Sequence, residues 1–195
     1  MLTIDLLRHG ALKGGIKYRG LQDDALTLEG RDAMDTVWQK IQQDVSLIIS
    51  SPLTRCAQPA LAWAKEKDIT CILDSELQEL HYGAWEGLTA AEIKVLNPGV
   101  LEKWRKNPEH MSPPQGESMD DFSKRIALFL QQLVRDHEQG HILLVAHSGT
   151  IRMLVAHALK APIVSTRHLA MPYACWSRLQ VEHNQLMLCF HGRQP

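Results

Sequence analysis

Short apolar runs recur along the chain and are separated by longer segments with mixed polarity. The runs at 3–7, 46–50, 69–73 and 141–147 are dominated by aliphatic residues, so each predicts a strand buried in a sheet. A longer segment follows each of them. This alternation predicts an α/β fold with a mainly parallel central sheet. Two later apolar runs flank Glu182-His183-Asn184 and predict a closing β-hairpin.

Amphipathic periodicity between the strands predicts helices at about 28–42, 52–67, 118–139 and 148–159. Thr27 is suited to cap the first of these helices, and Pro52 is suited to the first turn of the second. Gly140 is expected to stop the third. Helices therefore follow strands over most of the length, as the predicted sheet requires.

The middle of the chain is less regular. Residues 79–87 (ELHYGAWEG) read as a loop, and Thr89 to Glu92 has the spacing of a capping box that starts a short helix. A second short helix is expected around Leu101 and Trp104, and the proline-rich stretch 107–116 is expected to be irregular. We predict one domain, 1–195, in which a small insertion at about 79–117 covers the functional site.

Composition narrows the class of protein. The chain has 195 residues, 45% of them hydrophobic and 22% charged, and a formal net charge of −1. This balance is typical of a globular domain, and the lack of basic excess argues against a nucleic-acid partner. No apolar stretch is long enough to span a bilayer, and the four cysteines form no Cys-x-x-Cys pair. We expect a cytoplasmic protein with reduced thiols and no membrane partner.

Cationic side chains gather where predicted strands end. Arg8 and His9 follow the first strand, Arg55 lies one helical turn beyond the second, and His147 closes the strand HILLVAH. Carboxyl ends of parallel strands form one edge of a sheet, where ligands of α/β proteins bind. Two guanidinium groups and two imidazoles at one edge suit a dianionic phosphoryl group.

Each of these residues has a simpler explanation. A histidine at a strand end is more often packed or solvent-facing than catalytic, and Arg55 alone reads as a helix-surface charge. The prediction depends on the conjunction, above all on two histidines that each close an apolar strand. The helix after Ser148-Gly149 would add backbone N–H groups for an anion.

Five ordered motifs, LLRHG, SSPLTR, ELHYGAWEG, GES and VAHSG, span about residues 2–159. In these motifs the chain resembles the histidine phosphatase superfamily, which includes the cofactor-dependent phosphoglycerate mutases. The resemblance implies a three-layer α/β/α sandwich and a covalent phosphohistidine on His9. It implies no cofactor for this chain.

The same resemblance assigns roles to the other motif residues. Arg8 and Arg55 would clamp the phosphoryl oxygens, His147 would donate a further hydrogen bond, and Glu79 would be the general acid. The chemistry agrees, because a neutral imidazole can attack phosphorus and a nearby carboxyl group can protonate the leaving oxygen. We expect no metal ion in this mechanism.

Other polar residues compete for places in the site. Glu86 could be mistaken for the acid but is expected to brace a loop. Glu117, in the GES motif, is expected near the site or at a helix start, and His81 either lines the rim or packs on Trp85. Arg19 either extends the basic pocket or solvates a loop. The residues we predict for substrate binding are Arg19, His81, Glu117, Ser148 and Gly149.

The chain departs from the superfamily pattern at Ala11-Leu12, where many relatives carry Glu-Thr after Arg-His-Gly. The missing polar groups put the rate in question. The stretch GGIKYRGLQDDALTLEG resembles the α-ribazole phosphatases of cobalamin biosynthesis. The predicted activity is therefore metal-independent hydrolysis of a small phosphorylated metabolite, with α-ribazole 5′-phosphate the first candidate.

Two alternatives remain open. One is a phosphoglycerate mutase-type transfer, which the short chain disfavours because a mutase must exclude water from its phosphohistidine. The other is a phosphate-binding protein that lost catalysis with Glu-Thr. Association as a homodimer is also left open.

Overall fold

The computed structural model describes residues 1–183 and 185–195, without the side chain of His110. Six strands and six α-helices follow one another in these ranges. Their bounds are β1 Leu2–Arg8, α1 Leu28–Ile41, β2 Leu47–Ser50, α2 Thr54–Lys67, β3 Thr70–Leu73, α3 Ala90–Leu96, α4 Val100–Lys106, α5 Met119–Asp136, β4 Gly140–Ala146, α6 Ser148–Ala158, β5 Trp176–Glu182 and β6 Gln185–Arg193. None of the helices so described is long and apolar enough to cross a membrane.

The six strands form one sheet in the order β3-β2-β4-β1-β5-β6. The first four strands in this order pair in parallel, whereas β5 runs antiparallel to both β1 and β6. The predicted hairpin is thus present at one end of the sheet; its turn at Asn184 lies outside the described residues. Because β1, β2 and β4 are parallel and adjacent, their carboxyl ends meet at one edge.

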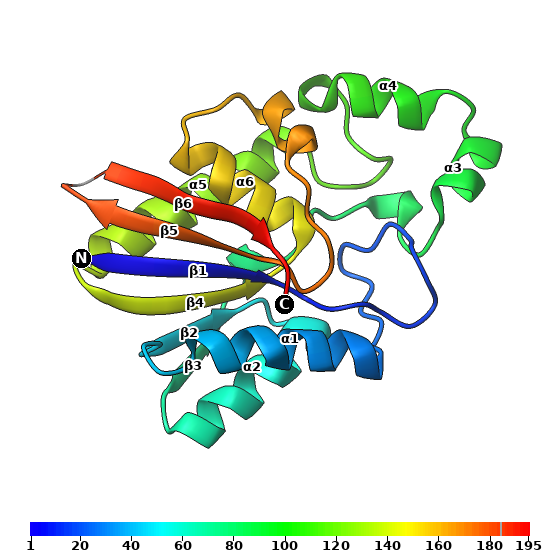
Figure 1. Cartoon of the computed structure of the whole chain (residues 1–195). Coiled ribbons are helices and arrows are strands. Elements are labelled where there is room, and N and C mark those ends of the chain that lie inside the picture. The colour runs from blue at the N-terminus through cyan, green and yellow to red at the C-terminus, as the bar shows by residue number, and fades with distance from the viewer. Residues whose placement is uncertain (184) are drawn as a thin grey trace.

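Side-chain alternation in the strands explains why both faces of the sheet are covered. In β4, Ile142 and Leu144 pack in a cluster with α5 and α6, whereas Leu143 and Val145 pack with α1 and α2. Figure 1 shows α1 and α2 below the sheet and α5 and α6 on its other face. The predicted three-layer α/β/α sandwich with a mainly parallel sheet is confirmed.

Helices α3 and α4 lie beyond the carboxyl edge, at the upper right of Figure 1. The capping box at the start of α3 forms as predicted, with reciprocal hydrogen bonds between Thr89 and Glu92. A small cluster of Trp85, Ile93 and Leu101 anchors them, with Tyr18, Tyr82 and Trp104 packed against it. This cluster joins the segment 83–104 to the loop that follows β1.

Two local predictions were wrong, and one element was missed. Helix α2 begins at Thr54, so Pro52 precedes it; Pro59 instead lies inside the helix. Gly140 does not stop α5, which ends at Asp136, but starts β4 with a φ of +119° that disfavours a side chain. A 3₁₀ helix at Ile163–His168 was not anticipated.

Candidate active site

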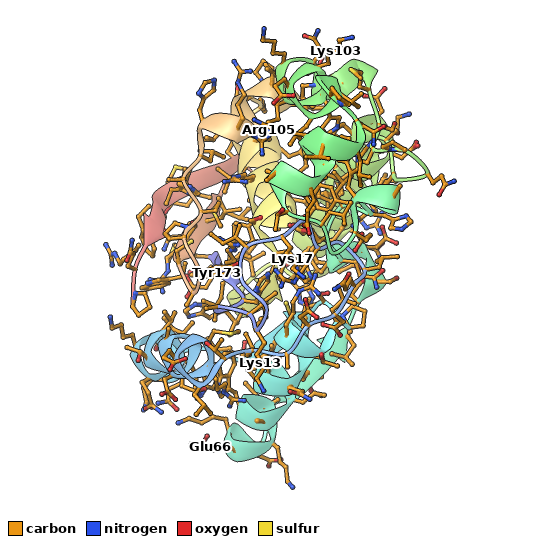
Figure 2. All side chains as sticks on the ribbon, turned by 90° about the vertical axis from the view of Figure 1, so that its right-hand side faces the viewer. Lys13, Lys17, Glu66, Lys103, Arg105 and Tyr173 are labelled. Carbon is orange, nitrogen blue, oxygen red and sulfur yellow. The ribbon has the colours of Figure 1, made fainter. Side chains whose placement is uncertain are left out.

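A pocket of about 240 Å³ opens at the carboxyl edge of the sheet. Its polar lining comes from distant parts of the sequence: Arg8 and His9 after β1, Arg19 from the next loop, Glu79, and Ser148 at the start of α6. Figure 2 looks onto this edge and labels three further lining residues, Lys17, Arg105 and Tyr173. The predicted convergence of strand ends therefore produces a cationic pocket.

His9 is held in a defined orientation at the base of this pocket. His9 is only 6% exposed, and its Nδ1 lies 2.9 Å from the carbonyl oxygen of Gly10. A carbonyl oxygen only accepts, so Nδ1 donates its proton and the lone pair of the neutral ring is on Nε2. The backbone geometry requires glycines: a Cβ on Gly10 would lie 1.9 Å from the carbonyl oxygen of Gly30 in α1.

Behind His9 lies a second buried imidazole, His147. The ring centroids are 5.3 Å apart. Nε of Arg55 donates to Nδ1 of His147 at 3.2 Å, which leaves the proton on Nε2 to bond Ser51 Oγ at 2.8 Å. Both nitrogens of His147 are therefore engaged within the protein.

Arg55 is 1% exposed and forms the back of this cluster. Besides His147, its guanidinium donates to the carbonyl oxygens of Gly20 and Gln22, both at 2.7 Å, and lies 3.3 Å from Asp23 Oδ1. Arg55 thus ties the loop after β1 to the strand ends, and it contributes positive charge without lining the pocket itself.

Burial and neighbouring charge keep both imidazoles neutral. Desolvation, then the guanidinium groups of Arg8 and Arg55, hold the pKa of His9 well below its ordinary value of 6.5. Desolvation, then Arg55 and His9, likewise depress the pKa of His147. The unprotonated form that a nucleophile needs is therefore the form present at neutral pH.

Arg8 lines the pocket beside His9. Its guanidinium stacks on the ring of Tyr173, with Cζ 4.1 Å from the ring centroid, and Nη1 donates to the carbonyl of Met171. Nε is buried and has no hydrogen-bond partner among the described residues. Arg8 and His9 therefore lie together in the lining of the pocket, with the Arg8 guanidinium held by Tyr173 and Met171.

Glu79 stands at the N-terminus of α6, on another wall of the pocket. It is 4% exposed, and its carboxylate accepts from the backbone N–H groups of Gly149 at 2.8 Å and Thr150 at 3.2 Å. Ser148 Oγ donates at 3.3 Å. The close approach of the Glu79 carboxylate to the start of α6 requires glycine at position 149, because a Cβ there would lie 2.3 Å from Glu79 Oε1.

The backbone around Glu79 is clamped by Arg125 of α5. Its guanidinium donates to the carbonyl oxygens of Glu76 at 2.6 Å, Gln78 at 3.0 Å and Glu79 at 3.1 Å. Glu117 grips the same guanidinium through two bonds of 2.7 and 3.1 Å. This pair positions the loop that carries Glu79.

Three of the residues predicted for substrate binding, Glu117, His81 and Gly149, do not line the pocket. Glu117 pairs with Arg125 and also accepts from the backbone N–H of His81 at 3.3 Å. Neither Glu117 nor His81 is among the residues that line the pocket. Their place in the structure is behind the Glu79 loop.

The remaining candidates divide between pocket and loop. Arg19 lines the pocket, yet its donors bind Asp24 and the carbonyls of Lys13 and Gly15, so it also shapes the loop after β1. Glu86 braces the same loop, as predicted, by accepting from Gly20 and its neighbours.

The pocket also contains residues that the sequence did not single out. Leu12, one of the two residues that depart from the superfamily pattern, lines it as an apolar group. Tyr173, Tyr82 and Arg105 line it as well. Tyr18 also lines the pocket, and its position next to the candidate Arg19 is the sequence signal that could have identified it. Tyr173 and Arg105 come from segments with no local motif.

No group of three or more His, Cys, Asp or Glu side chains with metal-site geometry occurs in the described part of the chain. The sequence does contain one His-x-x-x-His spacing, His137 to His141. It spans the end of α5 and the start of β4, where His141 Nε2 binds Asp5 at 2.7 Å. Absence of metal from the chemistry stays a prediction.

A neutral buried imidazole, cationic groups and a carboxyl group thus surround one pocket of an α/β/α sandwich. Residues 4–191 match the histidine phosphatase superfamily (branch 1), and the chain belongs to that family. Several relatives that the chain matches are named as phosphatases.

The curated relatives differ in name and length. A glucosyl-3-phosphoglycerate phosphatase of Mycobacterium tuberculosis is 31% identical over 89% of this chain and 83% of its own length. The adenosylcobalamin/α-ribazole phosphatase of Escherichia coli is 25% identical over 90% of this chain and 88% of its own. A bifunctional protein of M. tuberculosis is 30% identical over 80% of this chain, which spans only 44% of that protein.

Solved structures share the fold. A mycobacterial glucosyl-3-phosphoglycerate phosphatase in complex with VO3 superposes with a TM-score of 0.89, at 28% identity over 98% of this chain and 99% of that one. The α-ribazole phosphatase from Shigella flexneri superposes with a TM-score of 0.88 at 23% identity, over 98% and 96% of the two chains. At that identity the likeness concerns the fold alone.

Proposed function

We propose that the chain hydrolyses phosphate monoesters of a small metabolite through a phosphohistidine on His9. The observation that carries the proposal is the state of this imidazole. Its Nδ1 proton is bound by the Gly10 carbonyl, its Nε2 is free among the described contacts, and its pKa is depressed by burial and by Arg8 and Arg55. A free, neutral nitrogen in a cationic pocket is suited to attack phosphorus.

The first step transfers the phosphoryl group to the enzyme. Nε2 of His9 attacks phosphorus while the ester P–O bond breaks on the opposite side. Glu79, in its protonated form, gives its proton to the leaving oxygen, and the alcohol departs. Arg8, whose side chain lines the pocket, holds the phosphoryl oxygens through its guanidinium.

The second step returns the enzyme to its starting state. A water attacks the phosphohistidine, the P–N bond breaks, and the electron pair returns to Nε2 of His9. Glu79, now ionised, accepts a proton from that water. Inorganic phosphate leaves, and the hydrogen bond from Nδ1 to Gly10 is kept throughout.

Arg55 and His147 support these steps from behind. Their hydrogen bonds are made within the protein, so we assign them the role of keeping His9 oriented and the pocket positive. Direct donation from either side chain to the phosphoryl group would require one of these bonds to be exchanged.

For the substrate we propose α-ribazole 5′-phosphate as the first ester to assay. The motif after β1 and the E. coli relative support it, and the M. tuberculosis relative supports adding glucosyl-3-phosphoglycerate. Free phosphate from both esters would be compared with that from 3-phosphoglycerate. An isomer of 3-phosphoglycerate in place of free phosphate would favour the mutase alternative.

The nucleophile is tested with His9→Ala. We expect turnover to fall at least about a thousandfold with the fold intact, because removing a nucleophile eliminates the covalent route. The matched control is His137→Ala, at the end of α5 and outside the pocket. Circular dichroism checks folding, and labelled phosphate trapped on the parent but not on His9→Ala checks the intermediate.

Parent-like activity in His9→Ala would remove the proposed nucleophile. Anion binding without any labelled phosphoprotein in the parent would indicate a protein that binds phosphate and no longer catalyses.

Metal independence is tested by chelation. The proposed steps use only side chains of this chain, so we expect kcat and KM to be unchanged after dialysis against EDTA. Loss of activity that added divalent metal restores would overturn this part of the proposal.

A further inference from the structure

A second, larger cavity of about 680 Å³ adjoins the phosphate pocket. The two share Tyr18, Tyr82 and Arg105 as lining residues. Figure 2 shows Arg105 on the face that also carries Lys17 and Tyr173 of the phosphate pocket. The larger cavity is therefore the next space that a molecule bound at His9 can enter.

This cavity lies on the side of the general acid. Leu80, which lines it, directly follows Glu79, and Gly149, which also lines it, donates to the Glu79 carboxylate at 2.8 Å. The alcohol that leaves in the first step must contact Glu79 to receive its proton. The larger cavity is thus placed to hold the rest of that alcohol.

The inner wall of the cavity is apolar and aromatic. It includes Tyr82, Trp104, Phe122 and Met153. The rings of Tyr82 and Trp104 meet edge to face with their centroids 6.1 Å apart. Such a wall favours an apolar or planar portion of the ligand.

Most of the charged groups that line the cavity are positive. Arg105, Arg152 and Arg167 line the cavity, and none of them forms an ion pair with a carboxylate of the described residues. The lining contains one acidic residue, Glu102, which is already paired with Lys94 at 2.9 Å. Three guanidinium groups therefore face this space without a carboxylate partner.

The arginines are also held in place by neutral acceptors. Arg105 donates to the hydroxyl of Tyr18 through Nε at 3.2 Å, and Nε of Arg152 donates to the carbonyl of Leu169 at 2.9 Å. These bonds orient the guanidinium groups without neutralising them. An anion is the chemical partner that they lack.

We propose that the larger cavity binds the leaving alcohol of the substrate, and that this alcohol carries a second anionic group joined to an apolar or planar body. The proposal rests on the proposed function. It names the substrate class as monoesters with two separated negative centres, one phosphoryl group at His9 and one carboxylate or further phosphate at the arginine rim. Glucosyl-3-phosphoglycerate, whose alcohol carries a carboxylate, belongs to this class. α-Ribazole 5′-phosphate, whose alcohol is uncharged, does not, so of the two esters this inference favours the former.

The test uses two aryl phosphates that differ only in this charge. The probes are the phosphate ester of 3-(4-hydroxyphenyl)propanoate and that of the corresponding propanamide. The phenol is insulated from the carboxylate by two methylenes, so the leaving-group chemistry is closely matched. We expect kcat/KM to be at least about tenfold higher for the carboxylate probe, mostly through KM.

Variants locate the effect. Arg167→Gln and Arg152→Gln are each expected to bring the carboxylate-to-amide ratio of kcat/KM toward one. Lys103→Gln is the matched control: it removes one positive charge from α4, but Lys103 does not line the cavity. This control is expected to keep the parent ratio. Using two arginine variants guards against a folding defect in either.

The outcomes separate this proposal from the one it rests on. Equal kcat/KM for the two probes, with both hydrolysed through a labelled phosphoenzyme, would overturn the anionic subsite and leave the phosphatase intact. An unchanged ratio in both arginine variants would do the same. Failure of the parent to hydrolyse either probe or any panel ester would count against the proposed function itself.

Discussion

At the scale of single residues, the candidate site depends on two histidines kept uncharged inside the protein. His9 and His147 are almost fully buried, and each lies near Arg55. An imidazolium at either place would lose its hydration and meet like charge. The surroundings that suit His9 to the proposed role of nucleophile therefore also make its protonation unfavourable in the folded state.

This has a consequence for stability against pH. The unfolded chain takes up a proton on each histidine near pH 6.5, whereas the folded chain does so only at lower pH. The stability linked to these groups is therefore fully present above pH 6.5 and is lost as pH falls toward the folded-state pKa. We expect a loss of up to about 1.4 kcal/mol per pH unit for each histidine.

Urea denaturation at pH 7.5, 6.5 and 5.5 measures how the free energy of unfolding changes with pH. His9→Gln and His147→Gln each remove one titrating group. Each variant should lower the slope of the free energy of unfolding against pH by up to about 1.4 kcal/mol per pH unit, the contribution of one proton. A parent-like slope in both variants would show that other groups govern the acid sensitivity.

At the scale of elements, α5 serves the chemistry through its contacts with the Glu79 loop. Arg125 binds three carbonyl oxygens of residues 76–79, and Glu117 orients Arg125. Neither side chain lines the phosphate pocket. Both are therefore positioning residues for Glu79, the proposed general acid.

Loss of that position should affect poor leaving groups most. Activated aryl phosphates need little protonation, whereas alkyl esters need the acid. We expect Glu79→Gln to slow an alkyl phosphate about a hundredfold more than p-nitrophenyl phosphate, and Arg125→Gln to show the same pattern at smaller size. Arg125→Lys should recover part of the loss.

The control is Arg135→Gln, on the same helix, which removes an exposed arginine that pairs with Asp136. Its alkyl-to-aryl ratio should equal that of the parent. An equal loss on both ester types in Arg125→Gln would assign that residue to structure alone.

Elements were predictable where the local sequence decides them. Thr27 caps α1 and Thr89 opens α3, because each side chain satisfies an N–H of its own first turn. The edge where Arg8, His9 and His147 meet also followed, since parallel strands align their carboxyl ends. The start of α2 was misplaced, because Pro52 is compatible with both a first turn and the loop before it.

Other parts of the site depend on contacts that no local pattern encodes. Glu117 was expected near the site or at a helix start. It lies just before α5 and pairs with Arg125, which is eight residues farther along the chain, within that helix. Arg105 and Tyr173 reach the site only because α4 and the segment before β5 fold over the sheet edge. Such long-range packing is fixed by the whole fold.

At the scale of the whole molecule, the sheet separates stability from chemistry. Asp5, in the middle of β1, is fully buried and accepts from His141 of β4 at 2.7 Å and from Arg178 of β5 at 2.8 and 2.9 Å. One carboxylate thus links a parallel neighbour and an antiparallel neighbour of the central strand. His9 lies four residues farther along, about 13 Å away at strand spacing.

Removal of this carboxylate is therefore expected to lower stability and leave catalysis intact. Asp5→Ala leaves the partners of a buried charge unpaired, which costs about 3 kcal/mol and lowers Tm by about 6–12 °C for a chain of this size. Asp136→Ala is the control, because its pair with Arg135 is exposed and is expected to contribute under about 0.5 kcal/mol. Thermal melts measure the difference. The kcat at 20 °C should be parent-like in both variants, since Asp5 bonds to His141 and Arg178, and neither of these lines the phosphate pocket. If Asp5→Ala melted like its control, the three-strand link would contribute nothing; if it lost kcat while fully folded, the sheet interior and the catalytic edge would be coupled after all.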